Sequence, residues 1–357
     1  MQNAFLSHAD AALRNRNNIL RFVKEHTPIS RTDIWENVNV SRASVTQIIR
    51  QLQDSGLILE TGEGESTGGR KPKFLIFHGA ARKYYAFDWS ERCLYLMDLD
   101  GTVLYEKQLC FPTPVLPVEF AAEIKAAVAQ IDSLQLCPEE EVVGFGLSLP
   151  GQIDSRTGTV LRSVELGWQS ISLRELFADR FGGNVYLERT GNMMALGEKT
   201  DGSNHFQLYI LGSDGIGVST VIRGGCQHGA NYMHGELGHI KMPEDTLCSC
   251  GQRGCLEAVV RRLLQQSGGE ITEQVMEYLA MGVSASVNIS DTDSILLVGS
   301  FVEQMNRTQR NELKQKIREK VTSQHMRKLQ IRFSDSGKEL TKKGFCVYLF
   351  DRTFPVD

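Results

Sequence analysis

A histidine and three cysteines lie close together in the sequence, at a spacing that favours metal binding. They are His239, Cys248, Cys250 and Cys255, separated by nine, two and five residues. One imidazole and three thiolates complete the tetrahedral shell that structural Zn²⁺ prefers. Because no coordination position is left open, we expect the ion to order a loop rather than to take part in chemistry. The alternative is a set of unrelated buried thiols, since cysteine also serves as a small apolar core residue.

A second group of polar side chains lies near the N-terminus, on one face of an expected helix. In residues 42–56, Val45, Ile48, Ile49 and Leu52 recur at helical spacing and form an apolar stripe. The opposite face and a glycine-rich loop farther along carry side chains that can hydrogen-bond base edges or bind phosphates. The residues expected to contact DNA are Arg42, Ser44, Gln47, Arg50, Gln51, Arg70 and Lys71.

The elements around this helix predict a winged helix-turn-helix over residues 1–80. Ser30 and Ser41 stand where N-caps of two successive short helices belong, and Gly56 is placed to end the second. Two short strands, 57–60 and 73–77, flank the glycine-rich loop and form the wing. Short helices separated by a tight turn are the pattern of a helix-turn-helix. A small helical interaction domain with solvated polar faces is the alternative.

Length and composition exclude several classes of protein. The chain has 357 residues, 41% of them hydrophobic and 23% charged, with a net charge of −4, which is typical of globular domains. No apolar run approaches the ~20 residues that span a bilayer, and the N-terminus lacks a signal-peptide pattern. Eight cysteines are too few for a disulfide scaffold. We therefore expect a cytoplasmic protein with no membrane partner.

After residue 84 the pattern changes to strands that alternate with helices, which predicts an α/β fold with mixed sheets. Three sequential strands open this region, and a buried strand follows the first helix. A second strand-and-helix series follows residue 190. We expect two lobes, residues 81–190 and 191–357, with a cleft between them and the cysteine-rich loop in the second.

Two motifs around the metal ligands resemble the paired signatures of the ROK family (repressors, open reading frames and sugar kinases). The motifs are Glu236-Leu237-Gly238-His239 and the run from Cys248 to Glu257, CSCGQRGCLE. The likeness extends from about residue 12 to 352. It implies an actin-like or hexokinase-like ATPase core of two lobes around a sugar cleft. The N-terminal domain resembles that of the repressor branch, which is related to regulators of xylose and N-acetylglucosamine metabolism.

Three departures from the family's kinases predict that this chain is not an enzyme and has no catalytic residues. The phosphate-binding turn after the opening strand, 88–92, has Ser for Gly and Arg for Thr, and Trp89 is expected where the backbone should meet phosphate. The glycine-rich loop 212–217 has Asp214 in place of the usual Thr. Thr190 stands at the position of the family's catalytic Asp. A threonine hydroxyl cannot act as the general base at neutral pH.

The resemblance also implies a sugar-binding shell, which this chain keeps only in part. Glu236, His239 and Glu257 match the family, and His239 would bind zinc through one ring nitrogen and face the ligand with the other. Arg189, Thr190 and Glu165 replace the family's Asn, Asp and Asn. Arg189 suggests an anionic ligand such as a sugar phosphate or sugar acid. The competing interpretation is that Arg189 pairs with Glu165 or Glu188.

Together these features predict a sugar-responsive transcriptional regulator, most simply a repressor, that binds operator DNA as a homodimer or a tetramer. Two recognition helices are needed to read two half-sites one helical turn apart. A sugar or sugar-phosphate inducer would bind in the cleft and shift the DNA-binding domains. Two alternatives stay open: an active sugar kinase with a regulatory DNA-binding arm, and a ligand-free dimeric regulator controlled by a protein partner.

Overall fold

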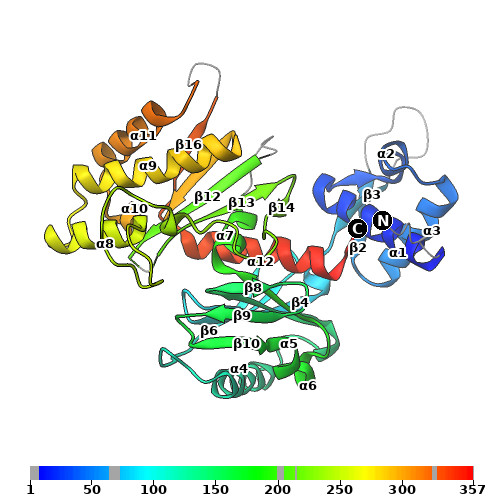
Figure 1. Cartoon of the computed structure of the whole chain (residues 1–357). Helices are drawn as coiled ribbons and strands as arrows, with labels where there is room; N and C mark the ends of the chain where they lie inside the picture. Colours follow the sequence, from blue (N-terminus) through cyan, green and yellow to red (C-terminus); the bar gives the residue numbers. More distant parts are fainter. Residues whose placement is uncertain (1–7, 64–72, 199–204, 214, 324–327, 357) are drawn as a thin grey trace.

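The structure is a computed structural model that describes residues 8–63, 73–198, 205–213, 215–323 and 328–356. It contains an N-terminal head and two α/β lobes (Figure 1). Within the described residues, every helix is too short or too polar to cross a membrane. The predicted α/β fold with mixed sheets and a winged helix-turn-helix is confirmed.

The head contains the predicted helices and a small antiparallel sheet of order β1-β3-β2. Ser30 caps α2 by accepting from the backbone of Asp33, and Ser41 caps α3 by accepting from Ser44, so both predicted caps are confirmed. Gly56 follows α3 with φ +73°, a conformation that favours glycine. The elements are α1 (His8–His26), β1 (Ile29–Ser30), α2 (Arg31–Asn37), α3 (Arg42–Asp54), β2 (Ile58–Glu63) and β3 (Lys73–Phe77).

The first lobe is built on a five-stranded mixed sheet of order β11-β7-β4-β5-β6. Its strands are β4 (Lys83–Asp88), β5 (Cys93–Asp98), β6 (Val103–Gln108), β7 (Val142–Leu149) and β11 (Val185–Arg189), with α4 (Pro117–Asp132) and the short η1 (Gly79–Ala81) and η2 (Glu139–Glu141). A second sheet, β8 (Gln152–Asp154), β9 (Thr159–Ser163) and β10 (Trp168–Ser172), was not predicted. After this sheet the chain forms two short helices, α5 (Leu173–Leu176) and α6 (Ala178–Phe181), which are divided at Phe177.

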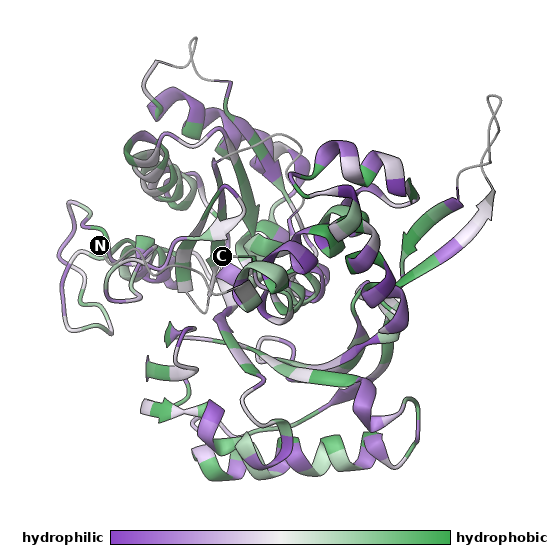
Figure 2. Ribbon diagram, turned by 90° about the vertical axis from the view of Figure 1, so that its right-hand side faces the viewer, coloured by the Kyte–Doolittle hydropathy of each residue, from purple (hydrophilic) through white to green (hydrophobic). Residues whose placement is uncertain are grey.

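The second lobe has a five-stranded sheet of order β14-β13-β12-β15-β16, in which β12, β15 and β16 run parallel. Its elements are β12 (His205–Gly212), β13 (Gly215–Ile222), β14 (Gly225–Cys226), η3 (Leu237–His239), α8 (Leu256–Gln266), α9 (Glu273–Ser290), β15 (Ser294–Val298), α10 (Ser300–Gln304), α11 (Arg307–Lys320) and β16 (Gln330–Phe333). Most apolar residues of these strands and helices form one buried cluster, and a second contains Phe206 and Leu208 of β12 and Leu296 and Val298 of β15. Figure 2 shows them as green stretches along the strands and the helices that cover them.

Two helices connect the lobes with the head. Helix α7 (Thr190–Gly197) begins directly after β11, and α12 (Gly337–Thr353) packs closely along it. A Cβ on Gly344 would lie 1.8 Å from the carbonyl oxygen of Met193, and one on Gly197 would lie 1.9 Å from that of Leu340. Only glycine permits this backbone-to-backbone contact. Although α12 follows the second lobe in sequence, it also packs on β4 and β7 and ends beside the head (Figure 1).

The end of α12 is anchored to α1 of the head by an ion pair and by stacking contacts. Arg21 pairs with Asp351 at 2.8 Å, and the Lys24 ammonium lies 4.4 Å from the centre of the Phe350 ring. The Asn17 amide donates to the carbonyl oxygen of Pro355 at 2.8 Å. Apolar residues of the head, of β4 and β5 and of α12 belong to one buried cluster. The head is therefore packed onto the first lobe through the C-terminal helix.

Candidate metal centre and effector site

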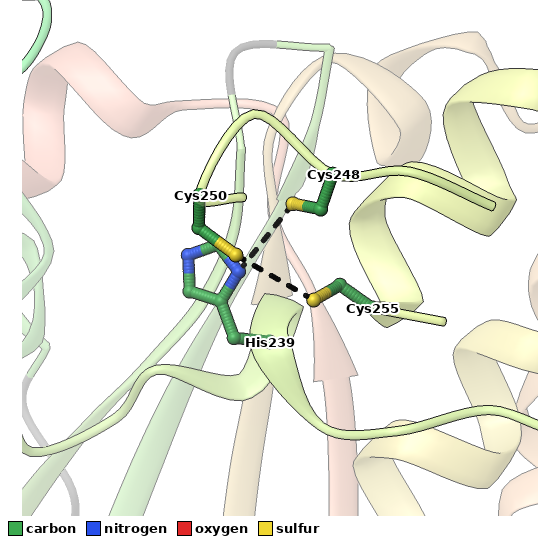
Figure 3. A group of neighbouring side chains, drawn as sticks. All are labelled: His239, Cys248, Cys250 and Cys255. Carbon is green, nitrogen blue, oxygen red and sulfur yellow. Dashed lines mark hydrogen bonds between the residues drawn. The ribbon is translucent and has the colours of Figure 1, made fainter. Parts of the chain in front are cut away.

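The four predicted metal ligands come together. His239 ends η3, Cys248 and Cys250 lie in the following loop, and Cys255 precedes α8 (Figure 3). Their ligand atoms lie within 4.8 Å of one another. The Cys250–Cys255 Sγ–Sγ distance and the distance from Cys248 Sγ to His239 Nδ1 are both 3.7 Å. Bonds of about 2.3 Å to a tetrahedral Zn²⁺ would put neighbouring sulfurs about 3.8 Å apart, so the donor set fits such an ion.

Backbone pairing closes the loop that carries the cysteines. Lys241 pairs with Cys255, and Leu247 pairs with Arg253, as isolated antiparallel bridges. Gly254 has φ +73°, and a Cβ there would lie 2.7 Å from the carbonyl oxygen of Glu244. The loop therefore requires glycine at this position.

Three residues to which the resemblance gives a role in sugar binding lie at the metal centre: Glu236, His239 and Glu257. Nε2 of His239 lies 3.7 Å from a carboxylate oxygen of Glu236, while Nδ1 faces Cys248. A carboxylate oxygen of Glu257 accepts from Cys248 Sγ at 3.5 Å. Nε2, the ring nitrogen that does not contact Cys248, is thus the one that lies beside Glu236.

Arg189 has partners that the sequence did not predict. Its guanidinium donates to the carbonyl oxygens of His234, at 2.8 Å, and Val218, at 3.4 Å, and lies 3.5 Å from the carboxylate of Glu236. The expectation that its side chain would pair with Glu165 or Glu188 is therefore wrong. The turn before η3 brings Glu236 against Arg189 at the end of β11. This contact could not be predicted from the sequence, because the two residues lie far apart in it.

Glu165 belongs to a separate cluster on the first lobe. Its carboxylate accepts from the indole Nε1 of Trp89 at 2.6 Å and lies 3.3 Å from Arg92. The Arg92 guanidinium stacks 3.4 Å from the centre of the Trp89 ring. The Trp89 side chain is buried, packing with Phe111 and Phe120 in the lobe core. The expectation that its bulk occupies the phosphate position is thus wrong, because the indole turns inward.

Glu188 is a buried carboxylate that sequence reasoning did not assign to the site. It accepts from Nε2 of His228 at 2.8 Å, Ser155 at 3.0 Å, Asn192 at 2.9 Å and the backbone of Arg189 at 2.8 Å. Burial alone would raise the pKa of Glu188, but the hydrogen bond and charge of His228 and the other donors outweigh it and lower the pKa. The ionised carboxylate therefore fixes the backbone from which Arg189 projects.

Residues around Thr190, where the resemblance places the general base, are polar, and Ser148 and Asp88 among them are buried. The Ser148 hydroxyl donates to the Thr190 hydroxyl at 3.3 Å. Asp88 is buried and accepts from the backbone and hydroxyl of Ser90, both at 3.1 Å. Burial raises the pKa of Asp88 to about 6. No carboxylate occupies position 190 itself, where the resemblance places the general base.

A cavity of about 540 Å³ opens between the turn that joins β12 to β13 and helices α8 and α10. Its walls are mainly apolar and include Ile216, Leu264 and Phe301, with Arg261 and Glu257 among the charged residues. Asp214, expected to repel phosphate here, lies outside the described residues. Glu257 borders both this cavity and the metal centre, so the two sites share a wall.

The head presents most of the predicted DNA-binding side chains to solvent. Arg42, Gln47, Arg50 and Gln51 are exposed on α3, and Gln47 and Arg50 lie opposite the buried stripe. Arg42 lies beside the stripe, with its guanidinium 3.6 Å from the centre of the Trp35 ring. Ser44 is half-buried, and its hydroxyl bonds to that of Ser41 within the helix cap. Two further predicted residues, Arg70 and Lys71, lie outside the described part of the chain.

Comparison with known proteins agrees with this architecture. Residues 91–266 match the ROK family and residues 14–61 match the MarR family. The chain is therefore similar to the ROK family over just under half of its length, and its N-terminal segment is similar to the MarR family.

Several relatives carry names of regulators. The chain is 25% identical over 319 residues to the xylose repressor of Bacillus spizizenii (strain ATCC 23059 / NRRL B-14472 / W23), covering 81% of this chain and 83% of that protein. It is 28% identical over 282 residues to the DNA-binding transcriptional dual regulator NagC of Escherichia coli (strain K12), covering 76% and 67%. The match spans only 64% of the length of a relative from Caldicellulosiruptor sp. (strain Rt8B.4) and of the xylose repressor of Bacillus subtilis (strain 168).

Solved structures share the fold. A ROK family transcriptional regulator, described as a homolog of the E. coli MLC protein, aligns with a TM-score of 0.79 at 22% identity, covering 96% of this chain and 98% of that one. The ROK hexokinase from Thermus thermophilus aligns with a TM-score of 0.60 at 22% identity, covering 75% and 97%. The second match covers less of this chain than the first.

Proposed function

We propose that this protein is a sugar-responsive transcriptional regulator, most simply a repressor, that binds operator DNA as a homo-oligomer. The observation that carries the proposal is the direct packing of the head onto the core that holds the metal ligands. A head with an exposed polar helix face is packed, through α12, onto a core in which Glu236, His239 and Glu257 surround a metal centre. Relatives named as xylose and N-acetylglucosamine repressors support the same function.

The DNA-binding part of the proposal is tested by selecting bound DNA from a random pool and measuring affinity for the recovered sequence. We expect Arg50→Ala to weaken specific binding, because Arg50 lies on the exposed face of α3. Glu303→Ala, on the second lobe, serves as the control and should leave affinity unchanged. Equal affinity of the Arg50 variant and the unmodified protein at several salt concentrations would contradict this assignment of the recognition helix.

The metal is proposed to be a structural Zn²⁺ held by His239, Cys248, Cys250 and Cys255. Three thiolates and an imidazole suit zinc, and the interatomic distances support four-coordinate binding. When bound, the ion would tie the loop to η3 and fix the orientation of the His239 ring. The chain's own contribution is to present Nε2 of that ring toward Glu236.

The ligand is proposed to be an uncharged sugar rather than a sugar phosphate. The charge of Arg189 is already neutralised by Glu236, and two backbone carbonyls use its N–H groups. Arg92 and Glu165 likewise neutralise each other. The proposed zinc centre with its three thiolates has a charge of −1, and Glu257 adds another −1. Even with the nearby Lys241 ammonium, an added phosphate would therefore meet net negative charge and would have to displace Glu236.

Calorimetric titration with glucose, xylose, N-acetylglucosamine and the 6-phosphates of the two hexoses tests this assignment. We expect binding of at least one neutral sugar and no tighter binding of its phosphate. Arg189→Ala frees Glu236 and should weaken neutral-sugar binding by disordering that carboxylate. Preferential phosphate binding that is lost in the Arg189 variant would instead establish an anionic ligand.

Phosphotransfer is not part of the proposed function. Thr190 offers a hydroxyl that bonds to Ser148 where the resemblance requires a carboxylate base, and loss of such a base typically costs about 10²–10⁴ in rate. The cavity beside the glycine-rich turn is the one observation that favours the kinase alternative. A coupled ADP-release assay with ATP and common hexoses separates the two, because sustained sugar-dependent turnover would rescue the kinase.

Communication between the ligand site and DNA is proposed to run through α7 and α12. Arg189 and Thr190 begin α7 at the ligand site, and α7 is locked to α12 at the crossing of Gly197 and Gly344. The far end of α12 holds the head through Asp351. A ligand that binds one position of α7 better than another would therefore shift the heads and change their fit to two half-sites.

A further inference from the structure

Lys241 lies directly across from one of the metal-ligand cysteines. The antiparallel bridge pairs it with Cys255, and the neighbouring backbone bonds, Met242 to Gly254 and Leu256 to Ile240, flank this pair on both sides. Residues in such a position, between two sets of ladder bonds, have side chains that lie close together. The backbone therefore holds the Lys241 side chain against the cysteine.

The ammonium of Lys241 contacts the sulfur itself. Nζ donates to Cys255 Sγ at 3.4 Å and to the carbonyl oxygen of Arg253 at 2.8 Å. Within the described residues, no carboxylate lies within ion-pair distance of this ammonium. The cation is thus directed at a thiol and a carbonyl and is not already neutralised by an acidic side chain.

The negative charge of the metal centre explains how the contact between Lys241 and Cys255 could affect zinc binding. Three thiolates and one neutral imidazole around Zn²⁺ carry a net charge of −1. Glu236 and Glu257 lie next to the same centre and add negative charge. A cation in contact with a ligand sulfur offsets part of this negative charge, and residues that contact ligand atoms commonly tune metal affinity.

We propose that Lys241 is a positioning residue of the metal centre, whose ammonium offsets the charge of the thiolates and strengthens their hold on Zn²⁺. The inference rests on the zinc assignment but not on sugar or DNA binding. It predicts that zinc affinity depends on the charge at position 241 and that this dependence weakens as salt screens it.

The test measures the dissociation constant of Zn²⁺ for the full-length protein by competition with a chromogenic chelator, without sugar or DNA. Lys241→Met keeps the apolar stem but removes the charge, and we expect about tenfold or greater weakening, the range seen when partners of metal ligands are removed. Lys241→Arg should retain most of the affinity. Arg253→Met is the matched control, because this cation lies in the same loop but pairs with Asp245.

A merely structural role for Lys241 predicts a different result. If Lys241 only stabilised the fold, the Lys241→Met variant would unfold at a lower midpoint than the unmodified protein when both are free of metal. If Lys241 acts through its charge, that midpoint stays unchanged and only the zinc affinity falls. Affinity within twofold of the unmodified protein in Lys241→Met would overturn the proposal. An equal loss in Arg253→Met, a loss independent of salt, or failure of the unmodified protein to bind zinc would also overturn it.

Discussion

The crossing of α7 and α12 gives a sharp test of how the ligand site communicates with the head. At Gly344, an added Cβ would lie 1.8 Å from the carbonyl oxygen of Met193 and 2.7 Å from its carbon. These are backbone atoms, so no side-chain rotation relieves the clash. Restoring an ordinary contact of 3.4 Å requires the helices to separate by about 1.6 Å, the difference between the two distances.

Gly344→Ala should therefore lower the free energy of unfolding by about 1–3 kcal/mol, the usual cost of overpacking. Alanine recovers about 0.5–1 kcal/mol of this through its greater helix propensity. Gly337→Ala is the control in the same helix, since its Cβ would meet only the flexible end of Met194 at 3.4 Å. Urea titration followed by tryptophan fluorescence should show a lower midpoint for the first variant and an equal or higher one for the second.

The same two variants, Gly344→Ala and Gly337→Ala, test the coupling between sugar binding and operator binding. We expect saturating neutral sugar to change operator affinity less in Gly344→Ala than in the unmodified protein, while Gly337→Ala retains the full change. Fluorescence anisotropy with labelled operator, with and without sugar, measures both. If Gly344→Ala were as stable as the control and kept the full sugar response, the assignment of this crossing as the connection would be refuted.

Three further results are expected. The pKa of Asp88 is raised to about 6 in the folded protein. The raised pKa therefore stabilises the fold fully below the unfolded-state pKa near 4, and this stabilisation is lost as pH rises through 6. Asp88→Asn should gain up to about 3 kcal/mol relative to the unmodified protein between pH 4 and 7, and parallel unfolding-midpoint curves against pH would contradict this. Asp351→Asn removes the ion pair with Arg21 and should speed limited proteolysis between head and core, whereas Asp179→Asn, which breaks a pair on the first lobe, should not. Removing zinc with a chelator should expose the buried Cys248 to alkylation, a change that mass spectrometry detects and that zinc restores.

Local rules predicted much of the fold. The caps at Ser30 and Ser41 depend on hydrogen bonds within three residues, and the apolar stripe of α3 depends on helical periodicity, so both could be read from the sequence. The metal ligands were predictable for the same reason, because three of them lie within eight residues and belong to one loop.

Features that depend on distant contacts were missed. The strands of the β8–β10 sheet are three to five residues long, and their pairing with one another, not their periodicity, defines them. Arg189 meets Glu236 only because the turn before η3 packs against β11. The inward rotation of Trp89 depends on the aromatic residues Phe111 and Phe120. A single sequence contains none of these distances.

The reciprocal linkage between sugar and operator tests the central claim most directly. Sugar and operator DNA are expected to bind the same protein and to shift the same conformational equilibrium. Operator DNA must then change the dissociation constant for sugar by the same factor by which sugar changes the dissociation constant for operator DNA. We predict equal factors of at least about fivefold, within the usual range for allosteric coupling. Tight binding of both ligands with a factor of one in each direction would contradict the account.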